Sequence, residues 1–109
     1  MLDGAVGVAA SRKLVRSVFY KGLAAAVGEA LEAASLMGAD AERALRADIA
    51  QSLTEANAST VDRLQDGSRL HAVRREEEMA AAAEMLRALH LEPIMAEATR
   101  TWLGRIARH

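Results

Sequence analysis

The chain has 109 residues, 51% of them apolar, which is long enough for one domain with one hydrophobic core. Its 14 basic and 15 acidic side chains give a net charge of −1, so no global charge attracts nucleic acid or an anionic membrane. The absence of cysteine excludes disulfides and thiolate chemistry. No apolar run reaches membrane-spanning length, and the first ten residues lack the basic region of a signal peptide, so we expect a cytoplasmic protein.

The first predicted element is a long helix over residues 11–37, with a possible earlier start at Val8. At 100° per residue its first turns separate two halves. The polar half carries Arg12, Lys13, Arg16, Ser17, Tyr20 and Lys21. The other half is apolar and is expected in the core, with Leu14, Val15, Val18, Phe19 and Leu23. Farther along, small or apolar residues such as Ala24 and Gly28 replace the polar half.

Four shorter helical segments are predicted after a boundary at Gly38. Asp40 is expected to cap an amphipathic helix over residues 41–53. Ser59 or Thr60 is expected to cap a short segment over residues 61–65, which ends at a turn over residues 66–68. A helix then runs from residue 69 or 71 to residue 89, and Pro93 ends it and begins the last helix, over residues 94–107.

These segments predict an all-α fold: one helical domain over residues 1–109, built on one long N-terminal helix, with no strand. The core stripe of the fourth segment is expected to contain Met79, Ala82, Ala83, Leu86 and Leu89. The chain has three aromatic residues and abundant alanine, so its core removes little apolar area from water. We therefore expect a partner, either a second copy or another domain. Trp102 is interpreted as a core residue or an interface anchor.

The first candidate site is the stripe of Lys13, Arg16, Ser17 and Lys21. Cations that converge beside a hydroxyl bind carboxylate or phosphate, and a lysine also supplies a proton. The alternative is a solvated basic helix face, which composition alone favours.

The second candidate site lies in residues 71–79, where His71, Arg75 and Glu78 share one helix face. The alternative is ordinary surface ion pairing, for example Arg74 with Glu78. The histidines are not at metal-ligand spacing, so no metal site is expected. Glycine-rich phosphate loops, nucleophile elbows and paired catalytic carboxylates are also absent from the sequence.

Two stretches carry a family resemblance: AASRKLVRSVFYKGLAAAVGEALEAASLMGAD and, after it, HAVRREEEMAAAAEMLRALHLEPIMAEAT. Their patterns K-x-x-R-S-x-x-x-K-G and H-A-x-R-R-x-x-E-M resemble the C-terminal helical domain of the β-hydroxyacid dehydrogenase superfamily. More narrowly, the chain resembles the branch of 6-phosphogluconate-dehydrogenase-like NAD-binding oxidoreductases. In that superfamily the long helix links a Rossmann domain to the helical domain, and the helical domains of two subunits interlock.

The resemblance implies that Lys13 is the catalytic acid/base, with Arg16 and Ser17 where relatives have substrate-binding asparagines. This replacement implies a more anionic substrate. Relatives have a later Lys-Asp pair that contacts the substrate, and this chain has Glu77 and Glu78 near those positions. His71 and Arg75 are therefore our candidates for that substrate contact. Lys21 is added to the substrate-binding group of Arg16 and Ser17. No glycine-rich nucleotide-binding motif is present, so NAD or NADP is expected to be supplied by a domain absent from this chain.

Two functional hypotheses result. The first is the substrate-binding and dimerisation domain of an NAD(P)-dependent hydroxyacid-type oxidoreductase, inactive in hydride transfer without its Rossmann domain. The second is a stand-alone, non-enzymatic helical dimer that associates through its Ala/Gly-rich surface and binds a small anionic metabolite. Both predict a homodimer and a carboxylate- or phosphate-bearing ligand, with neither nucleic acid nor a membrane as partner.

Overall fold

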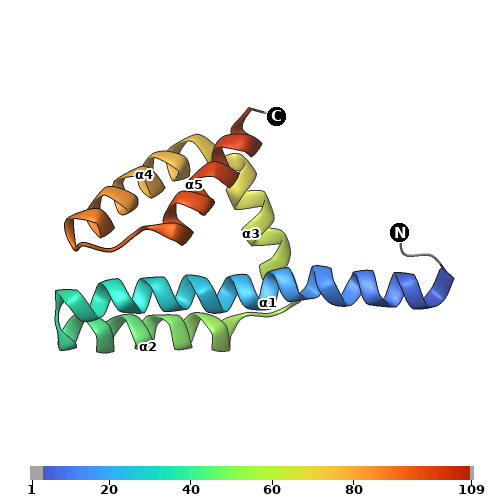
Figure 1. The fold of residues 1–109 in the computed structure, drawn as a ribbon, viewed down its shortest axis with the longest axis horizontal. Coiled ribbons are helices and arrows are strands. Elements are labelled where there is room, and N and C mark those ends of the chain that lie inside the picture. The colour runs from blue at the N-terminus through green and yellow to red at the C-terminus, as the bar shows by residue number, and fades with distance from the viewer. Residues whose placement is uncertain (1–3, 109) are drawn as a thin grey trace.

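The computed structural model describes the backbone of residues 4–108 and the side chains of residues 7–108. Five helices and no strand are present over this range, as the sequence predicts (Figure 1). In chain order they are α1 (Gly4–Met37), α2 (Ala39–Glu55), α3 (Ala58–Leu70), α4 (Ala72–Ala88) and α5 (Ile94–Ala107). The fold is therefore all-α and is built on one long N-terminal helix.

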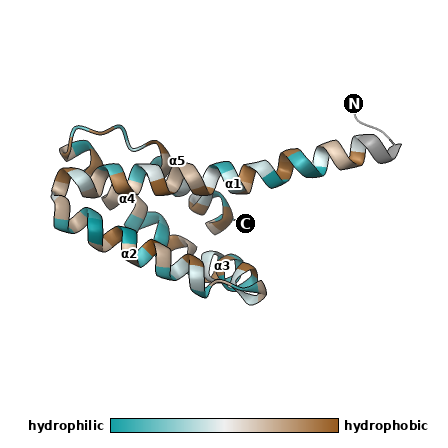
Figure 2. Cartoon of the chain, turned by 90° about the horizontal axis from the view of Figure 1, so that it is seen from below, coloured by the Kyte–Doolittle hydropathy of each residue, from teal (hydrophilic) through white to brown (hydrophobic). Residues whose placement is uncertain are grey.

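The helix α1 forms the long axis of the molecule, whose principal extents are 51 × 31 × 28 Å (Figure 1). The helix α2 runs back along the C-terminal half of α1, and α4 and α5 form a hairpin on another side of that half. The N-terminal half of α1 projects beyond the other helices in both views (Figures 1 and 2). The domain is thus packed around one half of its longest helix.

The turn between α1 and α2 depends on Gly38, as predicted. Its backbone has φ 131° and ψ 161°, a conformation essentially restricted to glycine. The prediction that Asp40 caps α2 is wrong, since Gly38 occupies the N-cap and no side chain bonds there. Asp40 lies inside the first turn of α2 and pairs with Arg43.

The third element is longer than predicted, because no turn occurs at residues 66–68. Asn57 begins α3 with a capping box: its Oδ1 accepts from the Ser59 amide at 2.9 Å, and its own amide donates to Thr60 Oγ1 at 2.9 Å. Gly67 is helical, and the Arg75 guanidinium covers it. The chain turns instead at His71, which ends α3 and begins α4.

The hairpin between α4 and α5 begins with a Schellman motif. The amide of Leu91 donates to the Leu86 carbonyl at 3.0 Å, and that of His90 donates to the Arg87 carbonyl at 2.9 Å. His90 takes the left-handed position with φ 64°. Thus α4 ends before Pro93 is reached, while Pro93 is the N-cap of α5, whose predicted bounds are confirmed.

The core is small and consists mainly of alanine. The buried apolar side chains are Ala33, Ala34, Ala72, Ala83, Leu86, Ala96 and Leu103. Of the predicted stripe on α4, Ala83 and Leu86 are buried and the other members are half-buried. Small side chains at the α4–α5 contact let the two helices approach closely, and little apolar area is buried there.

The apolar half of α1 is not in the core, contrary to the prediction. Leu14, Val15, Val18 and Phe19 are all more than half exposed, with Val18 at 74%. Leu23 is half-buried and borders a pocket against α2. The periodicity correctly identifies an apolar face, but none of the other described helices buries it.

Candidate functional site

The basic stripe lies on the projecting half of α1. Lys13, Arg16 and Lys21 are exposed, and Ser17 is half-buried. Residues 4–28 contain four basic side chains and no carboxylate, and within the described part of the chain none of the four forms an ion pair. The stripe is therefore an accessible region of uncompensated positive charge, which attracts anions.

Aromatic rings at the stripe restrict one of its cations. The Arg16 guanidinium carbon lies 4.9 Å from the centroid of the Tyr20 ring, in a cation–π arrangement. The Tyr20 ring in turn meets Phe19 edge to face, with centroids 5.0 Å apart. Arg16 is thus held against α1, with its donor groups at the surface.

The second pair of candidate residues lies on α4 and at its start. His71 is half-buried and lines a pocket of about 540 Å³ whose described lining residues come from α3, α4 and α5. Arg75 is also half-buried and packs on Gly67. Arg74 and Glu78 lie 3.8 Å apart in an exposed i,i+4 pair, as the surface ion-pair interpretation predicts.

The two groups of candidates lie on helices with different main neighbours. The helix α1 contacts α2 and α5, whereas α4 contacts α5 and α3. The residues lining the pocket at His71 include none from α1. The residues of the basic stripe therefore lie close together on α1. The pocket that contains His71 is a separate feature of the single chain.

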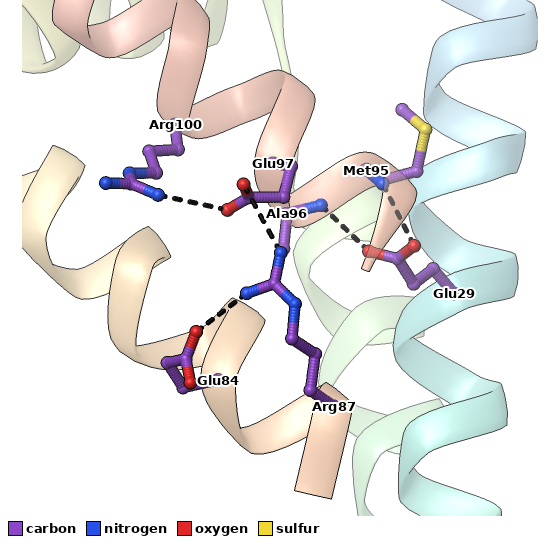
Figure 3. A network of polar contacts seen from close by, with 7 residues as sticks. All are labelled: Glu29, Glu84, Arg87, Met95, Ala96, Glu97 and Arg100. Carbon is purple, nitrogen blue, oxygen red and sulfur yellow. Dashed lines mark hydrogen bonds and ion pairs between the residues drawn. The ribbon is translucent and has the colours of Figure 1, made fainter. Parts of the chain in front are cut away.

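Glu29, on the buried side of α1, is a structural residue that the sequence reading missed. Its carboxylate accepts hydrogen bonds from the backbone amides of Met95 and Ala96, at 2.9 and 2.8 Å (Figure 3). These amides are in the first turn of α5, whose N-cap Pro93 has no polar side chain. Glu29 supplies the missing cap from another helix and complements the positive end of the helix dipole.

A signal for this contact exists in the sequence. Glu92 and Pro93 precede α5, and the N-cap position lacks Ser, Thr, Asp or Asn. A helix start without a local acceptor needs one from elsewhere, and Glu29 is one of two acids in residues 22–37, whose other side chains are apolar or small.

Arg87 joins α4 to α5 beside this cap (Figure 3). Its guanidinium lies 2.8 Å from Glu84 and 3.5 Å from Glu97, and Glu97 also lies 3.4 Å from Arg100. All four side chains are substantially exposed, so each pair contributes little free energy. The network helps to orient the hairpin, and the buried alanine contact holds it together.

An open apolar groove of about 740 Å³ lies where α1, α3 and α5 meet, and the sequence did not predict it. Its lining includes Phe19, Val61, Leu64, Trp102 and Ile106. Trp102 is 53% exposed, so it is not a core residue, and the Arg105 guanidinium carbon lies 5.0 Å from its ring centroid. The groove continues the exposed apolar face of α1 onto two further helices.

Other kinds of site have no counterpart in the described residues. Over the searched part of the chain, no group of three or more acidic or histidine side chains is placed to hold a metal ion. None of the described helices combines the length and apolar character needed to span a bilayer.

The fold and the exposed features define a small all-α domain that carries a cationic helix face and an open apolar groove. The chain belongs to the family described as Domain of unknown function (DUF1932), whose model matches residues 34–106, 73 of the 109 residues. The matched range contains His71 and Arg75 but not the basic stripe. No curated protein matches the chain, and no solved structure does.

Proposed function

We propose that this chain is the substrate-binding and dimerisation domain of an NAD(P)-dependent hydroxyacid-type oxidoreductase. The observation that carries the proposal is the uncompensated basic stripe on the projecting half of α1. The superfamily that the sequence resembles places its catalytic lysine on the helix that leads out of the nucleotide-binding domain. A long helix whose first half extends beyond its own domain suits that role.

The described residues do not form a dinucleotide site, because no strand and no glycine-rich turn precedes a helix here. NAD or NADP would be bound by another domain and would supply the hydride-transfer chemistry. The residues of this chain bind the substrate and move a proton.

Lys13 is assigned the proton transfer at the substrate hydroxyl or carbonyl oxygen. Arg16 is assigned the carboxylate, since a guanidinium binds both carboxylate oxygens, and Ser17 donates a further hydrogen bond. Lys21, two turns beyond Lys13, extends the positive charge along the substrate. In the single chain His71 and Arg75 lie apart from the stripe, so they would reach the distal anionic group of the same substrate only if another subunit or domain brought the two features together.

The test is Lys13→Ala in the complete enzyme, with its nucleotide-binding domain present. We expect kcat to fall by roughly 100-fold or more while cofactor affinity is retained, because only proton transfer is removed. The matched control is Arg12→Ala, a neighbouring exposed cation to which no role is assigned. Turnover equal to that of the control would refute the catalytic role.

The second candidate function is a non-enzymatic helical dimer that binds a small anion. It is favoured by the small alanine core and by the exposed small residues Ala24 and Gly28 on the line of the stripe. Under this hypothesis Arg16→Ala reduces anion binding and leaves the fold and dimer intact. The intact mass of the protein from its native source separates the two: about 11.7 kDa favours the stand-alone dimer, and a much larger mass favours the enzyme domain.

A further inference from the structure

We propose that Tyr20 is a positioning residue for the carboxylate-binding Arg16, and that Phe19 positions Tyr20 in turn. The inference rests on the proposed function, which assigns Arg16 to the substrate carboxylate, and it adds two neighbouring aromatic residues to that site. The role of the two rings is to present the guanidinium to the ligand, whichever partner covers the rest of α1.

Tyr20 follows Arg16 by one helical turn, so the two side chains lie on the same side of α1. The Arg16 guanidinium carbon is 4.9 Å from the centroid of the Tyr20 ring, inside the roughly 6 Å range of a cation–π contact. Of the described basic residues on α1, only Arg16 forms such a contact. An exposed arginine has many rotamers, and the ring favours those that bring the guanidinium to it. Arg16 therefore loses less conformational entropy when it binds a ligand.

The contact with Tyr20 leaves the hydrogen-bonding groups of Arg16 available. A cation–π contact uses the charge of the guanidinium and none of its five N–H donors. None of the described side chains forms an ion pair with Arg16, and residues 4–28 contain no carboxylate. A carboxylate that reaches Arg16 therefore meets an oriented cation for which no neighbouring anion on that stretch of α1 competes.

Phe19 restricts the Tyr20 ring. The two rings meet edge to face, with centroids 5.0 Å apart and 66° between their planes. Phe19 itself lines the apolar groove together with Leu64 of α3 and Trp102 of α5. A series of contacts thus runs from the residues of the groove through two aromatic rings to Arg16.

The ring and the hydroxyl of Tyr20 predict different results on substitution. Tyr20→Phe keeps the ring and should keep the affinity of Arg16 for a carboxylate. Tyr20→Leu removes the ring, so the affinity should fall by about two- to fivefold, the range expected for an exposed cation–π contact. Phe19→Leu keeps an apolar side chain in the groove but loses the edge-to-face contact, so its affinity should lie between those of the other two variants.

The experiment is a titration of the full chain with glycolate, a probe that carries a carboxylate beside a hydroxyl. Binding is followed by NMR at the Nε–H signal of Arg16, which reports the guanidinium directly. Tyr20 is 49% exposed, so the fold tolerates both of its variants. The matched control is Leu14→Ala, which is 65% exposed on the opposite side of α1 and should leave the dissociation constant unchanged.

Three results overturn the proposal, and they differ in what they say about the proposed function. If Tyr20→Phe weakens binding as much as Tyr20→Leu, the hydroxyl contacts the ligand and Arg16 keeps its assignment. If Tyr20→Leu binds glycolate as tightly as the wild-type chain, the ring does not position Arg16, which again keeps its assignment. If the wild-type Arg16 signal does not respond to glycolate, both the carboxylate assignment of Arg16 and the role of Tyr20 are refuted.

Discussion

His90 occupies the left-handed position that ends α4, with φ 64°. For a residue with a Cβ this conformation costs roughly 1 kcal/mol, and glycine adopts it without that cost. The two Schellman hydrogen bonds hold His90 there because they satisfy the last carbonyls of α4. One residue thus stores a small strain that a substitution relieves.

We expect His90→Gly to raise the free energy of unfolding by about 0.5 to 1 kcal/mol and Tm by about 2 to 6 °C. Thermal unfolding followed by circular dichroism measures both. The control is Ala88→Gly, at the last residue of α4, which should lower stability by a similar amount because its backbone is helical. Equal shifts of the same sign would show that His90 is not strained.

The sequence predicts such single residues unevenly. Gly38 was recognised as a boundary because glycine after an apolar helix is a strong stop signal. His90 was not recognised, since histidine carries no comparable signal and Pro93 offered a more obvious stop. The prediction for Asp40 is wrong because Gly38, two residues earlier, occupies the N-cap of α2, although aspartate is the more favourable capping residue.

At the scale of the elements, α5 depends on α1 for its cap. Pro93 leaves the first amides of α5 without a local acceptor, and Glu29 accepts from two of them. The contact is between charged and neutral groups and is partly shielded from water, which makes it stronger than an exposed ion pair. It is the polar contact that fixes the hairpin of α4 and α5 against α1.

We expect Glu29→Ala to lower the free energy of unfolding by about 1 to 2 kcal/mol, and Glu29→Gln by less. In the Glu29→Ala variant, the Met95 and Ala96 amides should exchange hydrogen faster than in the wild-type chain, while amides later in α5 should change less. Glu32→Ala, an exposed neighbour on α1, is the control and should change stability by less than about 0.5 kcal/mol. Unchanged exchange at these two amides in Glu29→Ala would contradict the capping role.

Helix number, type and order followed from the sequence because period, glycine and proline are local signals. The extent of α3 did not follow, since the Asp-Gly-Ser signal of a turn was outweighed by the capping box at Asn57 and by Arg75 packed on Gly67. The Glu29 contact joins residues 66 and 67 positions apart, and no periodicity encodes such a pairing. The basic stripe followed from local spacing, whereas the groove needed the packing of three helices.

At the scale of the whole molecule, the chain exposes far more surface than its mass requires. The apolar half of α1 was predicted as core because periodicity reports that a face is apolar and does not report what covers it. In the proposed dimer, a second copy that covered these side chains would make folding and assembly one equilibrium.

We therefore expect the Tm of the wild-type chain to rise with protein concentration, by roughly 4 °C for each tenfold increase. A dilution series in differential scanning calorimetry measures this slope. Val18→Glu puts a charge on this exposed apolar face, so that chain should show a lower Tm with no slope, because its unfolding no longer includes dissociation. A wild-type Tm independent of concentration would mean that a single chain is stable without a partner.

Because α1 is long, a small change in its angle at Glu29, where it binds the start of α5, would move its N-terminal end by several ångströms. Lys13 lies 16 residues from Glu29, which is about 24 Å along the axis of a straight helix. A rotation of α1 by about 10° about Glu29 would displace Lys13 by roughly 4 Å. A displacement of about 1 Å is enough to lower the rate of a catalysed reaction. In the proposed enzyme, the angle between α1 and α5 at the Glu29 contact would therefore determine the position of the Lys13 amine.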